Sequence, residues 1–222
     1  MRGTTIVFDL DGTLIDTAPD LIGSVNHMLA RMGLSPVEAA RIRPEISFGA
    51  RRMLEKALEI HKVTQSEKEL DRLYAEYLVH YEENIAVLSR PFPQLVDVLD
   101  RLDARGARLA VCTNKWEGLA RKLLAQLQLE QRFAAITGRD TFDVFKPDPG
   151  HLLGTIERAG GIPGRAVMIG DSDTDIRTAK AARIPVVAVS FGYTDTHVRH
   201  LGADRVIDHF AELEVALDAL LS

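Results

Sequence analysis

The sequence predicts an α/β protein, with a Rossmann-like, doubly wound parallel sheet as its core and an inserted α-helical cap domain. Short apolar strands alternate with amphipathic helices after residue 90, as is typical of a parallel sheet covered on both faces. Between the first strand and this alternation, residues 17–84 carry helical patterns only. We therefore expect a core domain of residues 1–16 and 85–222 and a cap domain of residues 17–84.

Composition narrows the class of protein. The chain has 222 residues, 46% of them hydrophobic and 27% charged, which is ordinary for a globular protein with a buried core. A net charge of -5 provides no basic surface, so neither nucleic acid nor a membrane is expected as a partner. The single cysteine, Cys112, excludes an internal disulfide and is expected in the core. Without an apparent signal peptide or membrane span we expect a cytoplasmic protein, either a monomer or a homodimer.

The first strand is predicted from the apolar, β-branched run Thr4, Thr5, Ile6 and Val7. Asp9 and Asp11 follow it, where Gly12 breaks the extended chain. Two carboxylates held this close repel each other, so one pKa rises or a cation lies between them. Mg²⁺ suits such oxygen ligands. A solvated turn or a calcium loop is the alternative for these residues taken alone.

The cap follows this turn directly. Asp16 or Thr17 is expected to begin its first helix, and Gly33 to end it. Further helices are predicted over residues 51–61 and 66–84 from apolar residues at helical spacing. No strand pattern interrupts this part of the sequence.

The remaining elements complete the core in regular alternation. Each strand is a short apolar run, and each helix is an amphipathic segment between two strands. The strands are expected at 108–112, 134–137, 166–169, 186–189 and 205–207, with helices near 93–104, 116–127, 148–160, 173–182, 195–201 and 209–220.

Polar residues follow two further core strands, and parallel strands place all of them at the same edge as Asp9. Thr113 and Asn114 follow one strand; a hydroxyl and the amides of a helix N-terminus suit a bound phosphate, although either residue could simply cap the helix. Lys146, fixed in direction by Pro147, could neutralise phosphate charge. The alternative is a solvated surface lysine.

Three aspartates follow another strand and crowd like charges into five residues. We expect Asp171 to bind a metal and Asp173 to be only a helix cap. Asp175 is expected to point back and accept hydrogen bonds behind the metal ligands.

The motifs Asp9-Leu10-Asp11-Gly12-Thr13, Thr113-Asn114, Lys146, and Gly170-Asp171 with Asp175 together resemble the haloacid dehalogenase superfamily across the whole chain. The resemblance implies a Mg²⁺-dependent phosphatase for a small phosphate ester. It makes Asp9 the nucleophile that forms an aspartyl phosphate, and Asp11 the general acid and base. Its metal ligands would be the Asp9 side chain, the Asp11 backbone carbonyl and Asp171.

The cap is expected to set the substrate. Gly49 and Arg51 lie in a predicted turn that could approach the non-reacting end of an anionic ester such as 2-phosphoglycolate. A helix start with solvated arginines is the alternative. A pyrophosphatase, a sugar or nucleotide phosphatase, a β-phosphoglucomutase-like phosphomutase and a non-catalytic phosphate-binding regulator remain open.

Overall fold

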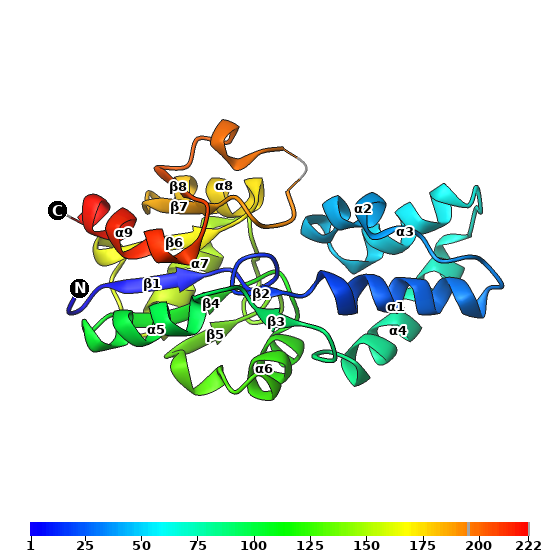
Figure 1. The fold of residues 1–222 in the computed structure, drawn as a ribbon, viewed down its shortest axis with the longest axis horizontal. Helices are drawn as coiled ribbons and strands as arrows, with labels where there is room; N and C mark the ends of the chain where they lie inside the picture. Colours follow the sequence, from blue (N-terminus) through cyan, green and yellow to red (C-terminus); the bar gives the residue numbers. More distant parts are fainter. Residues whose placement is uncertain (195, 222) are drawn as a thin grey trace. The chain divides into compact units, whose positions relative to one another are not determined.

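The computed structural model describes residues 1–194 and 196–221. Contacts between residues divide the chain into two compact units, one of Met1–Asp16 with Arg90–Ser222 and the other of Thr17–Ser89. The first is an α/β unit and the second is helical (Figure 1).

The α/β unit is built on a six-stranded parallel sheet of order β5-β4-β1-β6-β7-β8. The chain runs from β1 to β4 and β5 on one side, then to β6, β7 and β8 on the other, so the order reverses at β1. This is the predicted doubly wound fold. The strands are β1 Thr5–Phe8, β4 Arg108–Cys112, β5 Ala135–Thr137, β6 Ala166–Gly170, β7 Val186–Val189 and β8 Arg205–Ile207.

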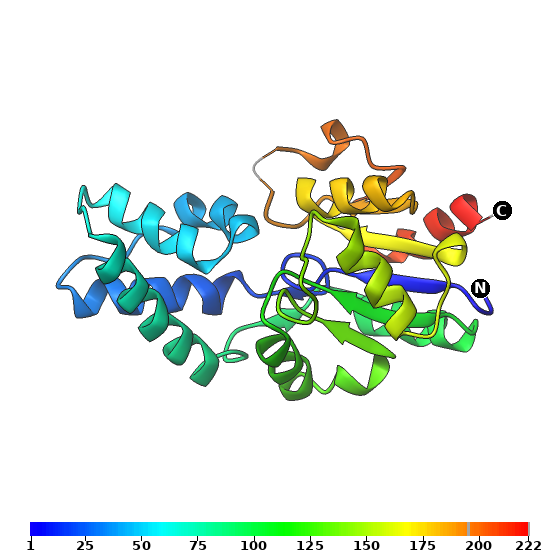
Figure 2. The same ribbon diagram turned by 180° about the vertical axis from the view of Figure 1, so that it is seen from behind.

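Helices cover both faces of this sheet, which explains why its strands are apolar on both sides. Figures 1 and 2 show α5 (Leu95–Ala104) and α9 (Leu213–Leu221) on one face and α7 (Pro149–Arg158) and α8 (Asp173–Ala182) on the other. The remaining helix, α6 (Glu117–Gln126), packs against β5. Every residue of β1 is buried, and so is Cys112, as predicted.

The segment before β8 differs from its prediction. Instead of a helix over 195–201, the structure has a 3₁₀ turn at Val198–His200, and residue 195 lies outside the described residues. The His197 ring accepts a hydrogen bond from the Arg199 amide, a local side-chain bond that competes with a regular helix. Similarly, the first turn predicted as helix near residue 209 is a 3₁₀ turn, Phe210–Glu212.

The helical unit contains α1 (Ala18–Arg31), α2 (Ala39–Ile42), a 3₁₀ turn (Arg43–Phe48), α3 (Ala50–Ile60) and α4 (Glu67–Glu83). Helix α1 contacts α3 and α4 and buries one apolar face against them. In the described parts of the chain, no helix has both the length and the apolarity needed to cross a membrane.

The chain leaves the helical unit at residue 89, whereas the sequence prediction placed this boundary at 84. The buried Asp20 carboxylate on α1 explains the difference, because it accepts hydrogen bonds from the amides of Leu88 and Ser89 and from the Ser89 hydroxyl. The α/β unit then resumes with β3 (Arg90–Pro91), which pairs with β2 (Ile15–Asp16).

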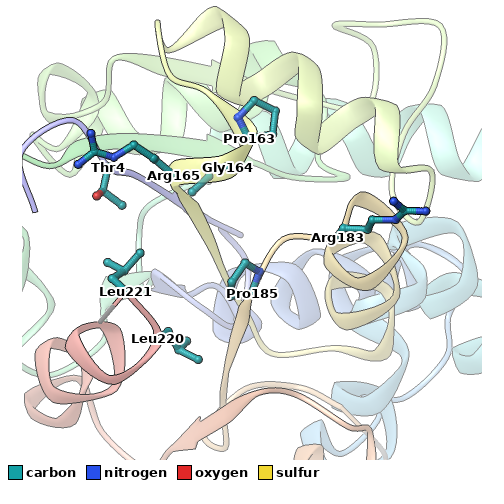
Figure 3. Close-up of a pocket in the computed structure, with 9 residues that line it drawn as sticks. Thr4, Pro163, Gly164, Arg165, Arg183, Pro185, Leu220 and Leu221 are labelled. Carbon is teal, nitrogen blue, oxygen red and sulfur yellow. The ribbon is translucent and has the colours of Figure 1, made fainter.

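A pocket of about 280 Å³ lies at the edge where the core strands begin (Figure 3). Its lining includes Thr4, just before β1, and Ala166, the first residue of β6. It is therefore at the opposite end of the strands from Asp9 and is separate from the predicted site.

Candidate active site

The strand register brings the predicted site residues to one edge. Phe8 pairs with Val111 of β4 and with Ile169 of β6, so the three strands end level with one another. Asp9 continues the ladder by donating its amide to the Ile169 carbonyl at 2.9 Å. We call the edge where these strands end the catalytic edge.

Three buried carboxylates meet a buried ammonium at the catalytic edge. Asp9, Asp171 and Asp175 each offer an oxygen, and these atoms lie within 4.8 Å of one another. The Lys146 ammonium lies 2.6 Å from Asp175 Oδ1 and 3.0 Å from Asp9 Oδ1. Its side chain is 2% exposed, so Lys146 is not a solvated surface lysine.

The charges of this cluster do not balance. Burial raises the pKa of Asp9 to about 6, against the opposing effect of Lys146 and with help from Asp175. Burial, then Asp175 and Asp9, also raise the pKa of Asp171 well above its usual range. For Lys146, burial lowers the pKa, but Asp175 and Asp9 outweigh it, and the pKa is raised. One ammonium thus faces three carboxylates.

The residues present fit a divalent cation. Asp9 Oδ1 is buried and, among the described residues, has the Lys146 ammonium as an ion-pair partner but no well-aligned hydrogen bond. Carboxylate oxygens are the donors that Mg²⁺ prefers. A cation between Asp9 and Asp171 would offset the burial and the like charges that raise both pKa values.

Asp171 is held in a tight frame. Its Oδ2 accepts a hydrogen bond from the Tyr193 amide at 2.8 Å, and its Oδ1 accepts one from the Thr13 hydroxyl at 3.3 Å. Only glycine fits beside it, since a Cβ on Gly192 would lie 2.2 Å from the Asp171 Cβ. Gly12 has a φ of +83°, and a Cβ there would lie 2.5 Å from Asp171 Oδ2. In the sequence, the close packing around Asp171 is indicated by the glycines of the neighbouring turns, Gly12 and Gly192.

Asp175 lies behind Asp171 and has protein partners for both oxygens. Its Oδ2 accepts from the Ser172 hydroxyl at 2.6 Å and from the Asp171 amide at 3.2 Å, while Oδ1 binds Lys146. The prediction that Asp173 caps α8 is wrong. Ser172 is the N-cap and forms a capping box with Asp175, because the helix already begins at Asp173, one residue earlier than a cap at Asp173 requires.

The loop after β4 is tied to the Lys146 loop. Thr113 is buried and its hydroxyl accepts the Lys115 amide at 3.2 Å, whereas the Asn114 side chain donates to the Lys146 carbonyl at 2.9 Å. Neither residue caps α6, because Trp116 occupies the N-cap position. Their phosphate-binding role stays a prediction.

One residue at the catalytic edge was missed. The Lys115 ammonium lies 3.1 Å from both carboxylate oxygens of Asp11. The sequence places Lys115 at the same edge as Thr113, two residues further along the chain, but gives it no role.

The two predicted cap residues lie at the start of α3. Gly49 occupies the N-cap with a φ of +94°, which favours glycine. The Arg51 guanidinium pairs with Asp71, with Glu67 at 2.6 Å and with Glu55 at 3.5 Å, all inside the helical unit. Their contribution to substrate binding therefore remains a prediction.

Comparison with known proteins agrees with the site geometry. Residues 6–189 match the family model described as "Haloacid dehalogenase-like hydrolase". The chain therefore belongs to the haloacid dehalogenase-like hydrolase family, as its motifs predicted, and this family membership makes it a hydrolase.

Individual relatives match nearly the whole chain. The phosphoglycolate phosphatase of Mesorhizobium japonicum is 51% identical over 217 residues, covering 98% of this chain and 96% of its own length. The N-acetylmuramic acid 6-phosphate phosphatase of Pseudomonas aeruginosa is 36% identical over 223 residues, covering 100% and 97%. The crystal structure of "a predicted phosphoglycolate phosphatase" from Haemophilus somnus superposes with a TM-score of 0.90 at 27% identity, covering 97% of this chain and 98% of that one.

Proposed function

We propose that this protein is a Mg²⁺-dependent phosphomonoesterase that hydrolyses 2-phosphoglycolate. The observation that carries the proposal is the meeting of Asp9, Asp171, Asp175 and Lys146 at the catalytic edge. An acid cluster with a buried lysine suits a phosphate ester, whose negative charge needs cations and whose phosphorus needs a nucleophile. The substrate is supported by the relative from M. japonicum.

In the first step, an oxygen of the Asp9 carboxylate attacks phosphorus and forms an aspartyl phosphate. The bond between phosphorus and the ester oxygen breaks, and Asp11 gives a proton to the departing alkoxide. Lys146 and Thr113 stabilise the negative charge of the phosphoryl oxygens. Asn114 holds the loop from which Lys146 extends.

In the second step, water attacks the phosphorus of the aspartyl phosphate. Asp11 now accepts the proton from that water, and the bond from phosphorus to Asp9 breaks, releasing inorganic phosphate. The Asp9 carboxylate returns to its starting state. Asp11 thus acts once as an acid and once as a base, so each turnover restores its proton.

The Asp9 and Asp171 carboxylates and the Asp11 carbonyl would hold Mg²⁺, which when bound supplies positive charge for the phosphoryl oxygens and for the nucleophile. Asp175 supports this arrangement from behind, because it fixes the Lys146 ammonium and the Asp171 amide. The unit Thr17–Ser89 is proposed to be a cap domain in which Gly49 and Arg51 contribute to substrate selection.

A second candidate substrate is N-acetylmuramic acid 6-phosphate, favoured by the 36% identical relative from P. aeruginosa. Both esters carry a carboxylate as well as a phosphate, and they differ greatly in size. A cytoplasmic location and a monomeric or homodimeric state are part of the same proposal.

The test is phosphate release from a panel of esters, in Mg²⁺ and then in EDTA. The panel contains both candidate substrates, a sugar 1-phosphate, a nucleotide and pyrophosphate. Asp9→Asn should abolish turnover, whereas the matched control Asp173→Asn, at an exposed position on α8, should not. Undiminished hydrolysis by Asp9→Asn would refute the mechanism, and binding without hydrolysis across the panel would indicate a regulator.

A further inference from the structure

Lys115 is a cation at the catalytic edge to which the mechanism above gives no role. Its ammonium lies 3.1 Å from each carboxylate oxygen of Asp11. The Lys115 side chain is 6% exposed and that of Asp11 is 19% exposed. Because water is largely excluded from the pair, the ammonium attracts a neighbouring anion more strongly than a surface lysine would.

The backbone of Lys115 is fixed on both sides. Its amide donates to the Thr113 hydroxyl at 3.2 Å, and its carbonyl accepts from the Arg139 amide at 3.0 Å. The neighbouring turn approaches so closely that a Cβ on Gly138 would lie 2.2 Å from the Glu117 nitrogen. Lys115 therefore extends from an anchored turn beside the reacting groups.

The proposed chemistry brings a substrate carboxylate to this position. The departing ester oxygen takes a proton from Asp11, so it must lie within about 3 Å of that carboxylate. In 2-phosphoglycolate, a single CH₂ group separates the ester oxygen from the carboxylate carbon. The substrate carboxylate is then close enough to the ester oxygen to reach the Lys115 partner of Asp11. The Lys115 ammonium, which lies beside Asp11, attracts a carboxylate at this position.

We propose that Lys115 binds the carboxylate of the leaving group and thereby selects small acid phosphates, an inference that rests on the proposed function. The charge of the Lys115 ammonium acts on any anion beside it, so Lys115 can attract the substrate carboxylate while it stays next to Asp11. The other cations considered for the substrate have different partners. Lys146 pairs with Asp9 and Asp175 on the phosphoryl side, and Arg51 pairs with carboxylates of the helical unit.

The test compares two esters that differ only in the group Lys115 is proposed to bind. Ethyl phosphate has a methyl group where 2-phosphoglycolate has its carboxylate. In Lys115→Met, kcat/KM for 2-phosphoglycolate should fall about 10- to 100-fold further than kcat/KM for ethyl phosphate. Lys115→Arg should retain most of the preference, because it keeps the charge. The control Lys180→Met, on the exposed part of α8, should leave both values unchanged.

Equal losses for the two esters would overturn the inference, since Lys115 would then act only by positioning Asp11. Unchanged kcat/KM values for both esters in Lys115→Met would overturn it as well. A wild-type protein that hydrolyses no ester of either kind would instead refute the proposed function itself. If Lys115→Met does not fold, the same comparison is made with Lys115→Gln. This variant lacks the charge but keeps hydrogen-bond donors, and the same outcomes test the inference.

Discussion

A single methyl group in the loop after β7 should disturb the proposed metal site. In Gly192→Ala the new Cβ would lie 2.2 Å from the Asp171 Cβ and 2.3 Å from Oδ2. Comfortable contact between such atoms begins at about 3.5 Å, so the Asp171 side chain must move by roughly 1 Å. Gly192 does not have a positive φ, so alanine introduces no backbone strain. Overpacking of this kind costs about 1–3 kcal/mol.

The displacement should appear in the metal dependence of catalysis. A shift in the support of a metal ligand typically lowers metal affinity or activity by about 10- to 100-fold. The assay is a Mg²⁺ titration of phosphatase activity, with circular dichroism to confirm folding. Gly164→Ala is the matched control, because a Cβ there meets no atom within 4 Å. A folded Gly192→Ala protein with wild-type Mg²⁺ half-saturation and kcat would refute the assignment of Asp171 as a ligand.

Three further predictions follow from the same edge. Ser172→Ala should lower the free energy of unfolding by about 1–2 kcal/mol in urea titrations, because the capping box with Asp175 is lost; an unchanged midpoint would contradict this. Burial, then Lys146, lowers the pKa of His151 to about 4. At this residue the unfolded chain therefore binds the extra proton as pH falls from about 6.5 to 4, and the contribution of His151 to the free energy of unfolding should drop by up to about 3 kcal/mol over that window. In urea titrations across pH, His151→Gln should lack this part of the pH dependence of the free energy of unfolding. The same slope of this free energy against pH as in the wild type would count against the prediction. Finally, Mg²⁺ should raise the Tm of the wild type over that in EDTA, and equal stabilisation of Asp171→Asn would argue that the ion binds elsewhere.

The sheet was predictable because its strands are buried on both faces. Two examples are the short apolar runs Thr5–Phe8 and Val186–Val189, which are bounded by turn residues. Such runs predict strands from the sequence alone. The segment at 195–201 was not predictable in the same way. Its described residues form a short turn stabilised by a local His197 contact that periodicity does not reveal.

The acidic residues of the site were predictable because parallel strands end at one edge. The shared edge brings Asp9 and Asp171 together whatever the direction of their side chains. The pairing of Lys115 with Asp11 depends on where a long, flexible side chain points, which spacing does not determine. The contact of Tyr193 with Asp171 depends on a loop 22 residues away, for which the sequence offered only a glycine as a signal.

The most direct test of the central claim is to look for phosphate bound covalently to Asp9. Turnover of 2-phosphoglycolate in Mg²⁺ is stopped with acid at short times, and the peptides are analysed by mass spectrometry. We expect a transient phosphoryl group on the peptide that contains Asp9, and on Asp9 itself after fragmentation. Rapid turnover with no phosphopeptide at any time, or with the phosphoryl group on another residue, would contradict it.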